Sequence, residues 1–201
     1  QRVTILMETQ FESVLSETSI QTSRGPLYFD HFINAAGSYS DKIAHKFGVA
    51  SHYSMIPFKG IYKQLCSEKA ALIKGNIYPV PNLENPFLGV HFTKHPSGNV
   101  YLGPTAIPVF GREHYSLLNG FSLEGLSIFI QDAKLFLTNP KFRKNALSEP
   151  KKYIPRLFYN EAAKLVKDLR PSDLTACSKC GIRAQLVDWS TNKLIMDFLT
   201  L

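Results

Sequence analysis

The sequence predicts an α+β fold, in which a mixed or antiparallel β-sheet carries a helical insertion. Short segments of alternating apolar residues, separated by glycine and proline turns, extend from the N-terminus to about Leu118. From about Ser122 to Leu169 the apolar period becomes helical, and an alternating segment returns at 181–187. Strands, then helices, then a strand again is the order typical of an α+β domain.

The first fifty residues predict strands that lead into a turn and a helix. The strands are expected at 3–7, 19–23 and 27–34, with a turn at Arg24-Gly25-Pro26. Ser38, followed three residues later by Asp41, is a capping-box pattern that predicts the start of a helix. We expect this helix to reach Phe47 and to end at Gly48.

Between the last of these strands and the helix lie Ala35, Ala36 and Gly37, which carry almost no side chain. Backbone amides at such a turn, next to a helix N-terminus, suit a phosphate or a flat ring that must approach closely. Tight packing of a strand against a helix requires small residues equally well. From these residues alone both interpretations stay open.

The remaining strand signals include a β-hairpin. Alternating segments predict strands at 57–65 and 76–80, and the strand at 87–93 is expected to pair with 99–103 across a polar turn containing Gly98. The helical region, about 122–169, holds a helix with start signals at Ser148 and Pro150. Its apolar stripe is explained by core packing and consists of Ile154, Leu157, Phe158, Ala162, Leu165, Val166 and Leu169.

Composition excludes several classes of protein. With 201 residues, 44% of them hydrophobic, the chain can bury a substantial core, and disorder is not expected. No apolar stretch approaches the roughly 18 residues of a membrane span. The net charge of +7 favours anionic partners, but the basic stretch lies among helical signals without a nucleic-acid-binding motif, so we expect a solvated helix face and no nucleic acid. That stretch comprises Lys141, Arg143, Lys144, Lys151, Lys152 and Arg156.

Three cysteines, Cys66, Cys177 and Cys180, show no disulfide framework, which suits a reducing compartment. Cys177 and Cys180 form a single CxxC motif. A structural zinc site needs two more ligands at matching spacing, and a redox dithiol would be expected at a helix start after a strand. We therefore expect two ordinary thiols in a loop and no metal.

A series of short motifs, taken in order, resembles the FAD-dependent L-2-hydroxyglutarate oxidase/dehydrogenase family, within the wider group of D-amino-acid-oxidase-like flavoproteins. The motifs are Asn34-Ala-Ala-Gly37, Ile56-Pro-Phe-Lys-Gly-Ile-Tyr62, Tyr78-Pro-Val-Pro81, Pro86-Phe-Leu-Gly-Val-His-Phe92, Val100-Tyr-Leu-Gly-Pro104 followed by Thr105 and Ala106, and Gly181-Ile-Arg-Ala-Gln-Leu-Val187. Each motif is short, but the combination is specific and covers almost the whole chain.

The resemblance implies that the sequence is the middle of such an enzyme. Complete members bind the ADP part of FAD with an N-terminal G-x-G-x-x-G unit and close a C-terminal segment over the flavin, and neither is present here. Residues 1–50 would be a partial, Rossmann-type FAD-binding segment of strand, turn and helix, and residues 51–201 the substrate-binding domain. We expect the 201-residue chain alone neither to retain FAD nor to turn over substrate.

The resemblance also assigns site residues. Oxidation of a 2-hydroxy acid moves a hydride from the α-carbon to the flavin, so the site must accept the hydroxyl proton and hold the carboxylates. His91 is the expected proton acceptor, although a hydrogen-bonded strand histidine is the plainer interpretation. Arg183 is the expected carboxylate clamp, with an internal salt bridge as its competing role.

Further contacts are expected around these two residues. Gln185 lies on the same strand face as Arg183, and Lys59 and Tyr62 come from another strand. The family usually carries arginine in place of Lys59, and lysine does not reproduce bidentate recognition of a carboxylate. The cofactor would be bound by Asn34, Ala35, Ala36 and Gly37.

The expected activity is oxidation of L-2-hydroxyglutarate, a small anionic 2-hydroxy acid, to 2-oxoglutarate, with oxygen or a membrane quinone as the final acceptor. Two alternatives stay open: a related FAD-dependent oxidase of amino acids or other amines, and a stand-alone binding domain. The expected location is cytoplasmic, with peripheral contact to the cytoplasmic side of a membrane left open, and the sequence does not indicate an oligomeric state.

Overall fold

The structure is a computed structural model, which describes residues 3–81, 87–113, 122–197 and 199–200. Within these ranges the chain forms two β-sheets, and all their strand pairings are antiparallel. The first sheet has the order β1-β2-β3, formed by Phe11–Ser16, Ser19–Thr22 and Gly25–Tyr28. Antiparallel sheets combined with helices agree with the predicted α+β class.

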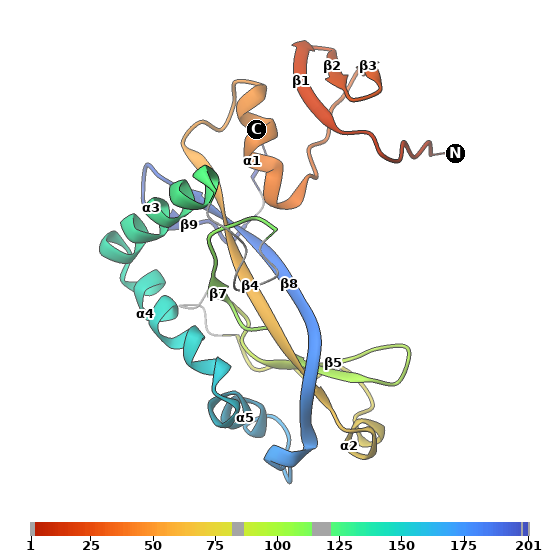
Figure 1. The fold of residues 1–201 in the computed structure, drawn as a ribbon, viewed down its shortest axis with the longest axis vertical. Helices are drawn as coiled ribbons and strands as arrows, with labels where there is room; N and C mark the ends of the chain where they lie inside the picture. Colours follow the sequence, from red (N-terminus) through yellow and green to blue (C-terminus); the bar gives the residue numbers. More distant parts are fainter. Residues whose placement is uncertain (1–2, 82–86, 114–121, 198, 201) are drawn as a thin grey trace.

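The second, six-stranded sheet has the order β5-β6-β4-β8-β9, with β7 paired to β4. Its strands are β4 (Tyr53–Leu65), β5 (His91–Lys94), β6 (Val100–Gly103), β7 (Ile107–Pro108), β8 (Leu174–Asp188) and β9 (Lys193–Leu194). The long strands β4 and β8 form the centre of this sheet and run side by side along most of the molecule (Figure 1). Their register is interrupted by a bulge between Ile61 and Lys63.

Three helices follow one another along one flank of the β4–β8 pair (Figure 1). They are α3 (Leu123–Thr138), α4 (Pro140–Ser148) and α5 (Pro155–Ala163), whereas α1 (Ser40–Lys46) and α2 (Ser67–Leu72) lie elsewhere. The Ser122 hydroxyl caps α3 by accepting the amide of Gly125 at 2.9 Å. Asn139 caps α4 in the same way, by accepting the amide of Phe142.

These helices bury two apolar clusters against the sheet. One joins α3 and α4 to the end of the sheet where β4 begins, through Leu135, Phe142, Phe58 and Val187. The other packs α5 on the β5–β6 hairpin, through Phe158, Phe92 and Leu102. Phe58, Phe92, Phe142 and Phe158 are each at most 2% exposed, so the helical flank stabilises the sheet mainly by burial of large aromatic side chains.

A small aromatic cluster joins the three-stranded sheet to α1. Phe32 lies 4.8 Å from Phe47, centroid to centroid, and 5.3 Å from Phe29, and Phe11 completes the group. Each of the four rings is only half-buried. Residues 1–50 thus hold their own small apolar centre, separate from the two clusters under the helices.

Several local predictions are confirmed. The β5–β6 hairpin pairs His91 with Gly103 and Lys94 with Val100, as expected. Helix α1 is followed by Phe47 and by Gly48 with φ = +76°, a backbone conformation that favours glycine at a helix end. The predicted strands at 57–65 and 181–187 lie within β4 and β8.

The strand predictions near the N-terminus are partly wrong. Residues 3–7 form no strand, and Val3, Ile5 and Met7 are each more than 70% exposed. Strand β3 ends at Tyr28, so the chain around Ile33, which is 88% exposed, is irregular and not the end of a buried strand. The alternation of apolar residues was not enough to predict these strands, because an apolar segment forms a strand only where a partner strand accepts its hydrogen bonds.

Other boundaries also differ. Ser38 does not cap α1: it lies in a 3₁₀ turn at Gly37–Tyr39, and Asp41 forms longer-range contacts instead. Pro150 belongs to a 3₁₀ helix at Glu149–Tyr153, and α5 begins only at Pro155. Residues 76–80 contribute a single bridge from Ile77 to Phe92. The expected end of the strand-rich region, near Leu118, lies outside the described residues.

Cys177 and Cys180 lie within β8 and not in a loop, which corrects the sequence-based expectation. The residues of the basic stretch lie in α4, in the 3₁₀ helix and at the start of α5.

Candidate active site

Four of the nine predicted site residues line one of two pockets that share Ile182 of β8. The first, which we name the turn pocket, has a volume of about 540 Å³. Its lining consists of Gly37, Ser38, Tyr39, Ser40, Met55, Arg112, Glu113, Ile182 and Ala184. The second, the strand pocket, has a volume of about 150 Å³. Its lining consists of Phe58, Gly60, Tyr62, Phe87, Leu88, Gly89, His91, Pro104, Thr105, Ala106, Gly181, Ile182 and Arg183.

The turn that precedes α1 is fixed by Asn34. Its side-chain amide donates to the carbonyl of Ser40 at 2.8 Å, and its side-chain oxygen accepts the amide of Ala36 at 3.3 Å. Gly37 has φ = +57°, and a Cβ at this position would meet no atom within 4 Å. Of the four predicted cofactor-binding residues, Gly37 lines the turn pocket, Asn34 braces the turn, and Ala35 and Ala36 form its backbone without lining the pocket.

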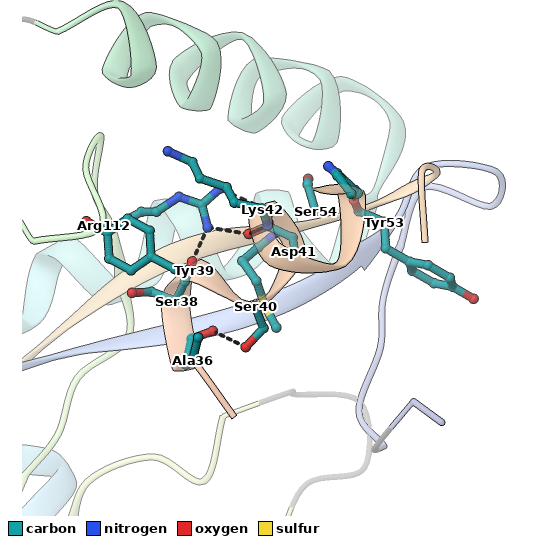
Figure 2. Close-up of polar contacts among 12 residues, drawn as sticks. Ala36, Ser38, Tyr39, Ser40, Asp41, Lys42, Tyr53, Ser54 and Arg112 are labelled. Atoms are coloured by element: carbon teal, nitrogen blue, oxygen red, sulfur yellow. Dashed lines mark hydrogen bonds and ion pairs between the residues drawn. The ribbon is translucent and has the colours of Figure 1, made fainter. Parts of the chain in front are cut away.

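A buried ion pair joins this turn to the six-stranded sheet (Figure 2). The two terminal nitrogens of Arg112 donate to Asp41 at 2.6 and 2.8 Å, and one of them also donates to the carbonyl of Ser38. Asp41 in turn accepts the backbone amide of Met55 in β4 at 2.8 Å. Arg112 is 7% exposed and Asp41 is 5% exposed, so the pair is an internal clamp between α1 and β4.

The charges around the clamp are mutually stabilising. Burial alone would lower the pKa of Arg112, but its hydrogen bonds to Asp41 and Glu124 outweigh burial and raise it. Burial tends to raise the pKa of Glu124, and its bonds to Lys42 and Arg112 reverse this and lower it. The guanidinium of Arg112 and the carboxylate of Glu124 therefore both stay charged over the ordinary pH range.

Tyr39 and Glu113 form a second polar pair at the rim of the turn pocket. The phenol donates to the Glu113 carboxylate at 2.7 Å, and this bond is the main reason that the pKa of Tyr39 rises to about 12. Sequence reasoning missed Arg112, Glu113 and the role of Asp41, because the pairs join residues more than 70 positions apart.

The strand pocket brings together His91, Tyr62 and Arg183, three of the five residues predicted to act on the substrate. His91 is half-buried, and its Nδ1 lies 2.9 Å from the carbonyl of Gly89. Because a carbonyl can only accept, Nδ1 must carry the proton, and Nε2 of the neutral ring then bears the lone pair. The ring centroid of Tyr78 lies 4.6 Å from that of His91, so Tyr78 supports this orientation.

Arg183 is exposed, and the carbon of its guanidinium lies 5.4 Å from the centroid of the Phe87 ring. Among the residues that the structure describes, no carboxylate forms an ion pair with it. Burial raises the pKa of Tyr62, so its phenol keeps its proton and can donate a hydrogen bond. The pocket thus offers a cation, a phenol and an imidazole lone pair over an apolar floor.

Lys59 and Gln185 do not line the strand pocket. The strand register pairs Phe58 with Arg183 and Lys59 with Ile182, so Lys59 lies on the opposite face of the sheet, where it is 6% exposed. Gln185 lies on the face of Arg183, as predicted, but it is 4% exposed and its side-chain amide donates to the carbonyl of Ile195. Ile182 lines both pockets, which makes β8 their common wall.

Across the described ranges, no three His, Cys, Asp or Glu side chains gather in a way that could hold a metal ion. The same ranges contain no helix of the length and apolar character needed to cross a bilayer.

Comparison with known proteins gives consistent family matches. Residues 1–195 match the family described as DAO, FAD dependent oxidoreductase. The mitochondrial L-2-hydroxyglutarate dehydrogenase of Bos taurus is 36% identical over 84% of this chain and 36% of its own length. The human protein of the same name is 34% identical over the same shares, and the L-2-hydroxyglutarate dehydrogenase of Indibacter alkaliphilus is 35% identical over 89% of this chain and 45% of its own length.

Among solved structures, a glycine oxidase from Bacillus cereus matches with a TM-score of 0.49 and 15% identity, over 92% of this chain and 39% of that chain. The present chain spans about two fifths of the length of the curated relatives that it matches. The expectation of a cytoplasmic location is wrong, because the cattle, human and mouse relatives are named as mitochondrial proteins.

Proposed function

Because the chain belongs to the FAD dependent oxidoreductase family, we propose that the full-length protein oxidises L-2-hydroxyglutarate to 2-oxoglutarate. The observation that carries this proposal is the similarity to proteins named L-2-hydroxyglutarate dehydrogenase, which are 33–37% identical over 83–92% of the chain. The grouping of His91, Tyr62 and Arg183 in one small pocket supports it.

The turn pocket has the properties of a site that receives part of FAD. The backbone at Gly37 is open, since a Cβ there would meet nothing within 4 Å, and the lining combines main chain with the ion-paired Arg112 and with Glu113. Gly37 and Ser38 would contact the cofactor, and Asn34, Ala35 and Ala36 would hold the turn in shape. When bound, FAD supplies the acceptor for the hydride that leaves the substrate carbon.

The residues of the strand pocket have distinct roles in this proposal. Arg183 binds a substrate carboxylate through two parallel charge-assisted hydrogen bonds. Tyr62 donates a hydrogen bond that fixes the orientation of the acid, and Nε2 of His91 accepts the proton of the substrate hydroxyl. Lys59 and Gln185 have no contact with the substrate in this arrangement.

The size of the strand pocket restricts the substrate class. A volume of about 150 Å³ is below the ~300 Å³ at which pockets for drug-sized ligands begin, so it accommodates only a small molecule. The exposed cation of Arg183 favours an acid over an amine. Both properties fit a short hydroxy acid.

A substrate panel on the full-length, FAD-loaded protein tests the proposal. With an artificial electron acceptor present, L-2-hydroxyglutarate should be oxidised, with its D enantiomer and L-amino acids as comparison substrates. Turnover of amines with hydroxy acids inert would replace the proposal by an amine oxidase. A protein that binds no flavin and turns over nothing would indicate a binding domain.

A further inference from the structure

The bulge in β8 places three residues opposite one residue of β4. Ile61 pairs with Cys180 and Lys63 pairs with Ala176, so Tyr62 alone lies opposite three residues of β8. We name residues 176–180 the cysteine bulge. Both cysteines of the CxxC motif lie in it, and each is half-buried.

The register limits how far apart the two cysteines lie. Two residues of a strand span about 6.6 Å, whereas the four steps from Ala176 to Cys180 would span about 13 Å if extended. Since both ends are paired to residues of β4 only two positions apart, the chain between them must fold back. The amide of Lys179 donates to the sulfur of Cys177 at 3.3 Å, which is a direct sign of this folding. The bulge therefore brings the two cysteines closer together than an extended strand would, toward the ~4.4–6.8 Å between Cα atoms that a disulfide spans.

The surroundings of Cys177 suit a nucleophilic sulfur. The amide of Lys179 points at it, and such a hydrogen bond is available to a thiolate, which is the reactive form. Lys179 belongs to the bulge, and its ammonium lies 4.4 Å from the centroid of the Tyr101 ring and 5.4 Å from that of Tyr62, so the bulge carries a cation held over these two rings. Partial exposure leaves the sulfur open to a small oxidant.

We propose that Cys177 and Cys180 form a reversible redox site that a hydroperoxide, such as hydrogen peroxide, oxidises to an intramolecular disulfide. The thiolate of Cys177 attacks one peroxide oxygen, the O–O bond breaks, and Cys177 becomes a sulfenic acid while hydroxide leaves. The thiolate of Cys180 then attacks that sulfur, the S–O bond breaks, the S–S bond forms and a second hydroxide leaves. Two thiols are oxidised, the peroxide is reduced, and the thiol protons join the two hydroxides as two waters.

The site is independent of the proposed substrate, but it adjoins the strand pocket. Tyr62, opposite the bulge, and Gly181, directly after it, both line that pocket. Closing the disulfide would tighten the bulge next to these two residues.

The test is peptide mass spectrometry of the full-length protein. The protein is treated with a small excess of hydrogen peroxide, and the remaining thiols are then blocked with N-ethylmaleimide. We expect the peptide that carries both cysteines to lose two hydrogen atoms, to take up no maleimide, and to regain both labelling sites after dithiothreitol.

Matched variants separate this site from general thiol oxidation. Cys66→Ser, at a half-buried thiol elsewhere in the chain, should leave the disulfide unchanged, whereas Cys180→Ser should trap Cys177 as a sulfenic acid that dimedone labels. Uptake of maleimide by both bulge cysteines after peroxide treatment would overturn the proposal. So would a disulfide formed only between two chains, or oxidation of Cys66 as fast as that of Cys177.

Discussion

The guanidinium of Arg183 lies beside the ring of Phe87 at the edge of the strand pocket, which is an arrangement suited to a planar carboxylate ligand. Replacing it by methionine keeps the length and apolar contact of the side chain but removes the charge. A hydrogen bond to a charged group contributes about 1.5–3 kcal/mol, so Arg183→Met in the full-length protein should raise the apparent KM roughly 10- to 100-fold.

Arg156→Met, at an exposed arginine of α5, is the matched control for Arg183→Met and should leave the KM unchanged. Arg183→Lys keeps the charge without the planar fork, so its KM should lie between those of the wild type and Arg183→Met. Equal KM values for wild type and Arg183→Met would contradict the assignment of Arg183.

Asp132 in α3 is a buried carboxyl group whose two oxygens have no hydrogen-bond partner among the residues that the structure describes. Burial raises its pKa from 3.8 to about 7. Between these two pH values the native state therefore holds the proton that the unfolded state releases. The stability that this proton provides is full below about pH 4 and is lost as the pH rises through 7, by up to about 1.4 kcal/mol per pH unit.

We expect Asp132→Asn to remove this pH dependence. In urea unfolding between pH 4 and 8, the free energy of unfolding of the wild type should fall relative to that of the variant as the pH rises. Asp168→Asn, at an exposed carboxyl group, is the control and should follow the wild type. Parallel curves for Asp132→Asn and wild type would show that Asp132 is charged in the native state.

At the scale of elements, the β4–β8 pair depends on small residues where other chain segments cross it. Gly60 in β4 pairs with Gly181 in β8, but only Gly60 is closely approached, because a Cβ there would lie 2.4 Å from the Cβ of Pro104. Gly60→Ala should therefore lower the free energy of unfolding by about 1–3 kcal/mol.

Gly181→Ala is the matched control for Gly60→Ala, since a Cβ on Gly181 would meet nothing within 4 Å. Loss of backbone entropy in the unfolded chain should make it neutral or stabilising by up to ~1 kcal/mol. Thermal or urea unfolding of the two variants measures the difference, and an equal effect of both would contradict the close approach of Pro104.

The ion pair of Asp41 and Arg112 fixes α1, and the turn before it, to β4. Removing one partner leaves the other charge buried, so Arg112→Met should cost about 3–5 kcal/mol of stability. Lys42→Met, which removes the exposed cation from Glu124 in the same cluster, should cost no more than ~1 kcal/mol. Denaturant unfolding measures both, and similar costs would show that the buried pair does not anchor α1.

The elements that the sequence predicted well are those that local signals determine. The β5–β6 hairpin follows from its alternation and its turn, and the end of α1 follows from Gly48. The clamp at Arg112 was not predictable, because its partner Asp41 lies 71 residues away and no sequence pattern links them. The bulge at Cys177 was missed for the same reason, since it exists only in the register of β8 against β4.

At the scale of the whole molecule, β8 separates and joins two pockets of different character. The turn pocket combines backbone with the ion-paired Arg112, and the strand pocket gathers the side chains of His91, Tyr62 and Arg183. The sequence resemblance named residues for both, but only the fold shows which of them share a pocket. Lys59 lies outside the strand pocket because the strand register places it on the opposite face of the sheet. Gln185 lies outside it because its side chain is buried and donates to the carbonyl of Ile195.

We infer that the strand pocket of the full-length protein oxidises a 2-hydroxy acid with His91 as the proton acceptor. The measurement is anaerobic bleaching of the flavin absorbance by L-2-hydroxyglutarate in the full-length protein, compared between wild type and His91→Asn. Loss of general-base assistance should slow bleaching about 10²–10⁴-fold while the flavin content stays unchanged, and His95→Asn, in the exposed hairpin turn, should bleach at the wild-type rate. Bleaching of His91→Asn as fast as the wild type, or no bleaching of the wild type by this acid, would contradict this role of His91 and the proposed substrate.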